Sequence, residues 1–207
     1  MLLDFLFPQK CPYCGKPLGC GQTECSECLK GFDTRAVIKK TPADDICIAP
    51  FEYKGAAATA IKNFKFRGVV FNCRSLSAAA ARAIKSSGIR AEIEVVTFVP
   101  MTKGRKRKRG FNQSQLLAKE ISALLKLPCE ELIARDKESE YQHKLGYEER
   151  AKHNKSYYRV KNPDRVRNRN ILLVDDIMTT GATLSSCSGI LKDNGAKTVY
   201  CAAAAIA

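Results

Sequence analysis

The stretch that decides the fold is residues 171–183, which read ILLVDDIMTTGAT. Four branched aliphatic residues lead into the adjacent acids Asp175 and Asp176, and a small, hydroxylated segment follows at 179–183. An unbroken aliphatic run predicts a strand that is buried on both faces, as in a parallel sheet. Ligands bind beyond the carboxyl ends of such strands, so the two acids and the following loop are predicted to lie at a binding edge.

Strands and helices are predicted to alternate along most of the chain. Strands are expected at 46–53, 92–100, 170–176 and 198–207, and helices at 56–66, 75–86, 113–126 and 183–195. This alternation indicates an α/β fold with a parallel sheet flanked by helices. In the helix at 113–126, four aliphatic residues at helical spacing are predicted to face the core: Leu117, Ile121, Leu124 and Leu125. Glycine, proline and cysteine are dense before residue 41, which predicts a small unit at 1–40 and a larger domain at 41–207.

The chemistry of residues 171–183 points to a ribose phosphate. Asp175 and Asp176 repel one another unless a cationic or hydroxyl-rich ligand lies beside them. The residues Thr179, Thr180, Gly181, Ala182 and Thr183 offer hydroxyl groups and backbone N–H groups, and the following helix adds the positive end of its dipole. We therefore expect the carboxylates to bind ribose hydroxyls and the loop to bind the 5′-phosphate.

Five of the ten cysteines lie before residue 29, and four of them follow a C-x2-C-x10-C-x2-C pattern. Two such pairs can direct four sulfurs at one ion, so Cys11, Cys14, Cys25 and Cys28 are predicted to hold a structural Zn²⁺ in a small ribbon. A redox C-x-x-C pair is the alternative. Cys20 is not expected to be a ligand. The other cysteines are expected to act as small core residues: Cys47, Cys73, Cys129, Cys187 and Cys201.

The chain carries a formal charge of +14, which favours phosphate-bearing partners. Six cations fall within seven residues after the strand that ends at Pro100: Lys103, Arg105, Lys106, Arg107, Lys108 and Arg109. Three interpretations remain open for this basic run: a solvated loop, a loop that closes over pyrophosphate, or a contact with a nucleic-acid backbone. The last two are compatible with each other.

Residues 135–170 are also rich in cations, interleaved with Tyr141, Tyr147, Tyr157 and Tyr158. Such a segment either binds single-stranded DNA by stacking or is a solvated face whose tyrosines pack on the core. At the other end, residues 1–8 read MLLDFLFP, which is short and contains Asp4. We expect a local hydrophobic anchor there rather than a targeting device or a membrane insertion, and hence a cytoplasmic protein with reduced thiols.

Residues 171–183 resemble the 5-phosphoribosyl-1-pyrophosphate (PRPP) motif of type I phosphoribosyltransferases. A wider set of residues resembles the competence protein F (ComF) family: the two C-x-x-C pairs, Val99-Pro100, RGFNQ at 109–113 and LLA at 116–118. Further matches are Arg135, Gln142, Leu145, Glu149, Arg150 and Asn154, while Lys137, Ser139 and the pair Tyr157-Tyr158 depart from the family pattern.

The resemblance implies a type I phosphoribosyltransferase-like domain behind a zinc ribbon, with Mg²⁺ bound together with PRPP. It implies a role in the uptake or processing of transforming single-stranded DNA, with competence or recombination proteins as further partners. In a transferase, Asp175 and Asp176 would be catalytic, because they would stabilise the positive charge that forms on the ribose carbon. An active phosphoribosyltransferase with an unknown acceptor and a PRPP-sensing regulator are the alternatives.

Overall fold

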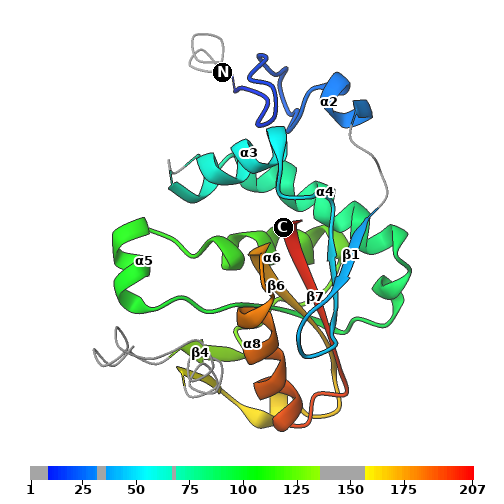
Figure 1. Ribbon diagram of the computed structural model, residues 1–207, viewed down its shortest axis with the longest axis vertical. Helices are drawn as coiled ribbons and strands as arrows, with labels where there is room; N and C mark the ends of the chain where they lie inside the picture. Colours follow the sequence, from blue (N-terminus) through cyan, green and yellow to red (C-terminus); the bar gives the residue numbers. More distant parts are fainter. Residues whose placement is uncertain (1–8, 32–35, 67–68, 136–156) are drawn as a thin grey trace.

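The computed structural model describes residues 9–31, 36–66, 69–135 and 157–207 (Figure 1). Within these residues five strands form the main sheet, in the order β1-β2-β7-β6-β3. The strands are β1 (Val37–Lys40), β2 (Ile46–Ala49), β7 (Thr198–Ile206), β6 (Asn170–Met178) and β3 (Val95–Phe98). β2, β7, β6 and β3 are parallel to one another, and β1 pairs antiparallel with β2 at the edge.

Strand β6 lies inside the sheet, between β7 and β3, and its aliphatic run is buried on both faces. Leu172 and Val174 belong to one hydrophobic core, and Ile171 and Leu173 belong to the other. This alternation follows from the two-residue period of a strand. The sequence-based prediction of a strand covered on both faces is therefore confirmed.

Helices cover both faces of the sheet (Figure 1). The first core contains residues of α3 (Gly55–Phe66), α4 (Asn72–Ser86) and α6 (Gln113–Leu125), whereas the second contains residues of α8 (Ala182–Asp193). A small antiparallel sheet of β4 (Ile133–Arg135) and β5 (Tyr158–Val160) packs on the second core. The remaining described elements are α2 (Ser26–Gly31), α5 (Lys103–Arg109), η1 (Ile89–Ala91) and η4 (Pro163–Arg165). None of the helices in the described residues has the length and apolar character that a membrane crossing requires.

The structure corrects three details of the sequence-based prediction. Residues 37–40, where no strand was predicted, form β1 and pair antiparallel with β2, so the sheet is mostly rather than wholly parallel. A short helix, α2, begins between Cys25 and Cys28, where none was expected. Leu124 is exposed, whereas the other three residues of its predicted stripe are buried. The division of the chain at residue 41 stays a prediction.

A polar contact attaches the N-terminal segment to helix α4. The carboxylate of Glu24 accepts hydrogen bonds from Ser75 Oγ and, at 3.0 Å, from Arg82 Nη2. Ser75 Oγ also lies 2.9 Å from the hydroxyl of Tyr13, whose ring meets Phe51 edge-on at 5.7 Å between centroids. The Glu24 side chain is only 6% exposed, so these partners, and not water, stabilise its negative charge.

We predict that Glu24→Ala lowers the free energy of unfolding by about 1–3 kcal/mol, because it removes hydrogen bonds to a buried charged group. Glu27→Ala is the matched control: Glu27 pairs with Lys16 in the same segment, but its side chain is 72% exposed, so its loss should cost less than about 1 kcal/mol. Urea unfolding of both variants measures the difference. Equal destabilisation by the two substitutions would show that the Glu24 contact does not attach the segment.

Candidate functional site

The two carboxylates near the carboxyl end of β6 are held by residues from two different helices. Asp175 Oδ1 accepts a hydrogen bond from Ser114 Oγ of α6 at 2.8 Å and another from the Asp176 N–H at 2.8 Å. The carboxylate of Asp176 pairs with Lys65 of α3, whose Nζ lies 3.0 Å from Oδ1 and 2.8 Å from Oδ2. The strand end, α3 and α6 therefore meet at these two acids.

The pKa of Asp175 is raised from 3.8 to about 7. Burial is the main cause, and the neighbouring Asp176 carboxylate adds to it. The hydrogen bonds from Ser114 and the Asp176 N–H, together with the charge of Lys65, act in the opposite direction and offset part of the shift. Near neutral pH the Asp175 carboxyl group is thus poised between its two protonation states, and a bound cation would favour the ionised one.

The loop after β6 encloses a small pocket of about 30 Å³. Its walls are Asp175 and the whole segment 177–184, so six of the seven residues predicted to bind PRPP line one pocket. Asp176, the seventh, is the one held by Lys65. The pocket lies at the start of the twelve-residue helix α8, where backbone N–H groups without helical partners favour a bound anion.

Gly181 fixes the shape of this loop. It precedes the first residue of α8 with a φ of 75°, a left-handed conformation that residues with a Cβ rarely adopt. A Cβ built on Gly181 would also lie 2.8 Å from Cδ of Pro42. In the same loop, Thr180 Oγ1 accepts a hydrogen bond from the Ala182 N–H at 3.4 Å. Backbone conformation and close packing therefore both require glycine at position 181.

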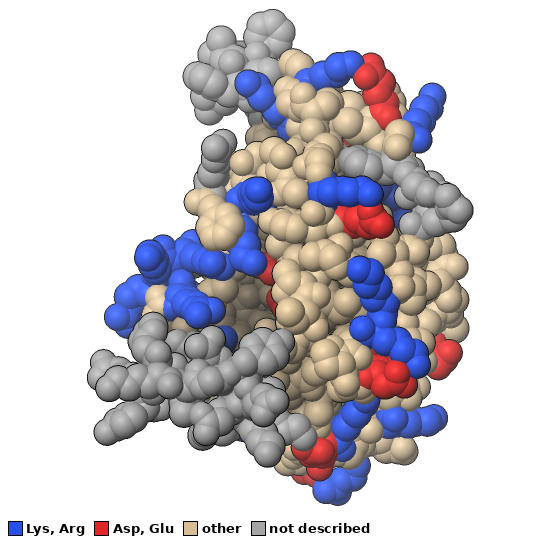
Figure 2. Space-filling model, viewed as in Figure 1, with Lys and Arg blue, Asp and Glu red and all other residues tan. Residues whose placement is uncertain are grey.

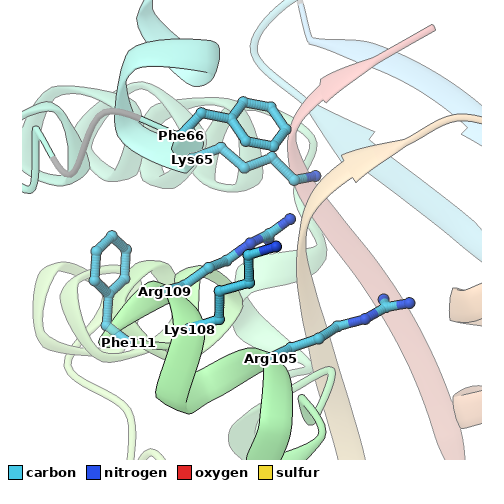
Figure 3. A pocket seen from close by; sticks show the side chains of 6 residues that line it. All are labelled: Lys65, Phe66, Arg105, Lys108, Arg109 and Phe111. Carbon is cyan, nitrogen blue, oxygen red and sulfur yellow. The ribbon is translucent and has the colours of Figure 1, made fainter.

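The basic run is a helix, α5, rather than the loop expected from the sequence. Thr102 begins it by accepting a hydrogen bond from the Arg105 N–H at 3.3 Å. Arg105, Lys108 and Arg109 are spaced by three and four residues and line one open cleft of about 440 Å³. Figure 3 shows Lys108 and Arg109 pointing toward the end of α3. The sequence-based prediction did not include a helix at these residues, and it did not place one face of the basic run on a cleft.

Lys and Arg side chains also gather on the molecular surface around α5, on the left of Figure 2. None of the α5 residues is buried. The three α5 cations that do not line the cleft are Lys103, Lys106 and Arg107. The helix therefore presents positive charge both to the cleft and to solvent.

The RGFNQ element joins α5 to α6 and to the cleft. Gly110 ends α5 with a φ of 83°. The guanidinium of Arg109 lies 5.4 Å from the centroid of the Phe66 ring, and its Nη1 donates to Gln113 Oε1 at 3.4 Å. Phe111 packs on the core with its ring centroid 5.7 Å from that of Phe64.

Asn112 of the same element sets the position of α6. Its side chain accepts a hydrogen bond from the Ser114 N–H at 3.1 Å, and its Nδ2 donates to the carbonyl oxygen of Val99 at 3.1 Å. The start of α6 is thereby attached to the chain after β3, and Ser114 is brought to Asp175. Ser114, Lys65 and Phe66 were not predicted to belong to the site. Of these three, only Ser114 could have been inferred from the sequence, because it lies in the first turn of a predicted helix, where polar side chains are common.

The four paired cysteines are brought together as predicted. Their sulfur atoms all lie within 4.8 Å of one another, and those of Cys14 and Cys25 are 3.6 Å apart. A tetrahedral zinc site requires sulfurs separated by about 3.8 Å, so these four residues fit a zinc ion. Burial raises the pKa of Cys11, but hydrogen bonds from the backbone of Cys25, Tyr13 and Cys14 outweigh it and lower this pKa to about 7. Cys20 is exposed and is not part of the cluster.

The burial of the remaining cysteines and of two tyrosines tests what was predicted for them. Cys47, Cys73, Cys187 and Cys201 are buried, as predicted for core residues, and Cys129 is partly buried. Tyr157 and Tyr158 are buried in the second core, which confirms packing rather than stacking on DNA for these two. Arg135 lies over the Tyr158 ring at 5.3 Å. Residues 1–8 and 136–156, with Tyr141, Tyr147 and the family matches from Gln142 to Asn154, lie outside the described residues.

Comparison with known proteins agrees with this geometry. Residues 112–205 match the model of the phosphoribosyl transferase domain. The chain is 29% identical over 194 residues to the DNA utilization protein YhgH of Escherichia coli O157:H7, covering 91% of this chain and 80% of that protein. It is 26% identical over 194 residues to competence protein F of Haemophilus influenzae, covering 91% and 81%.

A solved structure of glutamine PRPP amidotransferase from B. subtilis aligns with a TM-score of 0.46 and 18% identity, over 64% of this chain. The chain spans about a quarter of that enzyme, 26% of its length. The predicted resemblance and fold class are confirmed by the domain match and by the two curated relatives. Residues 112–205, which follow the four-cysteine segment, thus match a phosphoribosyl transferase domain, and most of the chain is similar to the DNA utilization protein YhgH and to competence protein F.

Proposed function

We propose that the protein binds PRPP or a related ribose 5-phosphate compound, together with Mg²⁺, and acts on single-stranded DNA during its uptake or processing. The observation that carries the ligand proposal is the pocket that Asp175 shares with the loop 179–183. Acids, hydroxyl groups and helix N–H groups converge there at one sheet edge. This combination suits a sugar that carries a phosphate.

Different residues of the site contact different parts of the proposed ligand. Asp175 and Asp176 accept hydrogen bonds from the ribose hydroxyls, and the backbone N–H groups of 180–183 receive the 5′-phosphate. Mg²⁺ supplies positive charge that neutralises the pyrophosphate when it is bound. Lys65 neutralises Asp176 in the ligand-free protein, so its ammonium group is released when the ligand and its cation approach.

Glycosyl transfer is a second candidate, favoured by the position of the two carboxylates beside the sugar. Carboxylates there would stabilise positive charge on the ribose carbon as pyrophosphate leaves. Release of pyrophosphate from PRPP in the presence of amines or nucleobases tests for turnover. PRPP binding without such release supports the regulatory alternative.

Substitution of both acids tests the ligand proposal. We expect Asp175→Asn combined with Asp176→Asn to abolish calorimetrically detectable PRPP binding in the presence of Mg²⁺. The fold should persist, because the substitution removes the repulsion between two buried charges. Circular dichroism checks the fold, and Glu52→Gln, on an exposed ion pair, is the control for charge. Equal PRPP affinity in the double variant and the wild type would refute the site.

The raised pKa of Asp175 gives a second test. A ligand that requires the ionised carboxylate must displace a proton below pH 7, and it meets an already ionised group above that pH. The ¹³C chemical shift of the Asp175 carboxyl carbon should therefore titrate near pH 7 in the free protein. With PRPP and Mg²⁺ the midpoint should fall by at least about one unit, if bound charge contributes about 1.4 kcal/mol or more. An unchanged midpoint in the saturated complex would place the ligand elsewhere.

The cysteine cluster is proposed to hold one structural zinc ion, which stabilises a segment too small to form its own core. Purified protein should contain about one zinc per chain. Cys25→Ser should remove it, and Cys20→Ser should leave it bound, because Cys20 lies outside the cluster. Metal analysis by mass spectrometry gives the answer, and full zinc content in Cys25→Ser would contradict the ligand set.

Helix α5 is proposed to provide much of the phosphate contact with DNA. Neutralising Arg105, Lys106, Arg107 and Lys108 removes up to four contacts, so the slope of log K against log salt for single strands should flatten by up to about 3 units. Arg105→Gln with Lys108→Gln, on the cleft, should account for more of this change than Lys106→Gln with Arg107→Gln. If α5 instead contacts only the pyrophosphate of PRPP, neutralising the four cations should lower the affinity for PRPP and leave the salt slope of DNA binding unchanged.

A further inference from the structure

The cleft between α3 and α5 has an unusual lining. All of its lining residues in the described part of the chain are cationic or aromatic: Lys65, Phe66, Arg105, Lys108, Arg109 and Phe111. Its volume of about 440 Å³ is much larger than that of the pocket at 179–183, and it is open to solvent. The lining therefore favours a ligand that has both negative charge and a flat apolar surface.

Phe66 is the residue that gives the cleft its aromatic surface. It is the last residue of α3 and is 68% exposed, whereas Phe64, two residues earlier, is fully buried. Burial of a phenylalanine ring stabilises a protein by about 1.5–3 kcal/mol, so an exposed ring forgoes that gain. The Arg109 guanidinium lies over this ring at 5.4 Å, and Figure 3 shows both side chains at the same opening.

Positive charge borders the ring on the side of α5. Arg105, Lys108 and Arg109 face the cleft at helical spacing, and Lys106 and Arg107 extend the charge along the same helix. Single-stranded nucleic acids are bound by this combination, in which cations follow the backbone and aromatic rings stack on bases. A base in a duplex hides its faces in the helical stack, so the exposed ring favours a single strand.

We propose that the cleft between α3 and α5 is a base-stacking site for single-stranded DNA, in which a base lies on Phe66 and the adjoining phosphates contact Arg105 and Lys108. This inference rests on the proposed action on single-stranded DNA and adds the site at which a base is held. The open cleft and the cations beyond it favour a polynucleotide over a mononucleotide, since a strand can continue along α5.

The experiment uses the full chain, loaded with zinc, and fluorescence anisotropy with two single-stranded probes of equal length. One probe is oligo-dT, and the other has the same phosphate backbone without bases. Phe66→Leu removes the ring and keeps an apolar side chain, Phe66→Tyr keeps the ring, and Leu124→Ala is the control for an exposed apolar residue on another helix. Thermal unfolding confirms that each variant is folded.

Phe66→Leu should weaken oligo-dT binding about fivefold or more, with a salt slope equal to that of the wild type, because stacking is lost and phosphate contacts remain. Binding of the abasic probe should be unchanged, and Phe66→Tyr and Leu124→Ala should bind both probes like the wild type.

Equal losses on both probes, or no loss on either, overturn the stacking site while the proposed DNA binding stands. Phe66-dependent binding of thymidine monophosphate, with oligo-dT binding that does not depend on Phe66, also overturns it, in favour of a nucleotide site. A wild-type chain that binds neither probe refutes the proposed DNA binding itself, and with it the inference.

Discussion

The site depends on two adjacent carboxylates that are held partly out of water near the carboxyl end of a central strand. Burial, and then the repulsion from Asp176, raise the pKa of Asp175 to about 7, and the surrounding residues only partly offset this shift. The offsetting groups come from separate parts of the chain: Ser114 from α6 and Lys65 from α3. The last turn of α3 and the first turn of α6 therefore each deliver one neutralising or hydrogen-bonding group to the two acids.

Lys65 lies between the pocket at 179–183 and the cleft between α3 and α5. Its ammonium group pairs with Asp176 beside the pocket, and the same side chain lines the cleft between α3 and α5. An anion that draws Lys65 toward the cleft would leave Asp176 less neutralised, and a cation at Asp176 would release Lys65. Lys65 thus faces both proposed ligand sites, so a ligand at either site would change the electrostatic surroundings of the other.

The sequence predicted those parts of the fold and the site that depend on local pattern. The aliphatic run at 171–174, the paired acids and the cysteine spacing each carry a strong physical signature, and the structure brings their residues together as expected. The edge strand β1 was missed because its residues are mostly exposed, so it has no buried face to give a two-residue period. Closely spaced like charges disfavour a helix, so the composition of the basic run does not predict one. Its N-cap Thr102 and the terminating Gly110 were the local signals for one. Lys65 and Phe66 could not be assigned, since their roles arise from contacts with residues far along the chain.

The packing of Gly181 against Pro42 has a consequence for the speed of ligand capture. The loop 179–183 is pressed against the turn that leads into β2, so its shape is set when the protein folds. A loop that is ordered only by its ligand loses conformational entropy during association, which weakens binding and often slows it. At this loop the proposed ligand would meet a preorganised site. Capture can then approach a rate governed by diffusion and by the long-range attraction between an anion and a strongly basic protein, and that rate should decline as ionic strength rises.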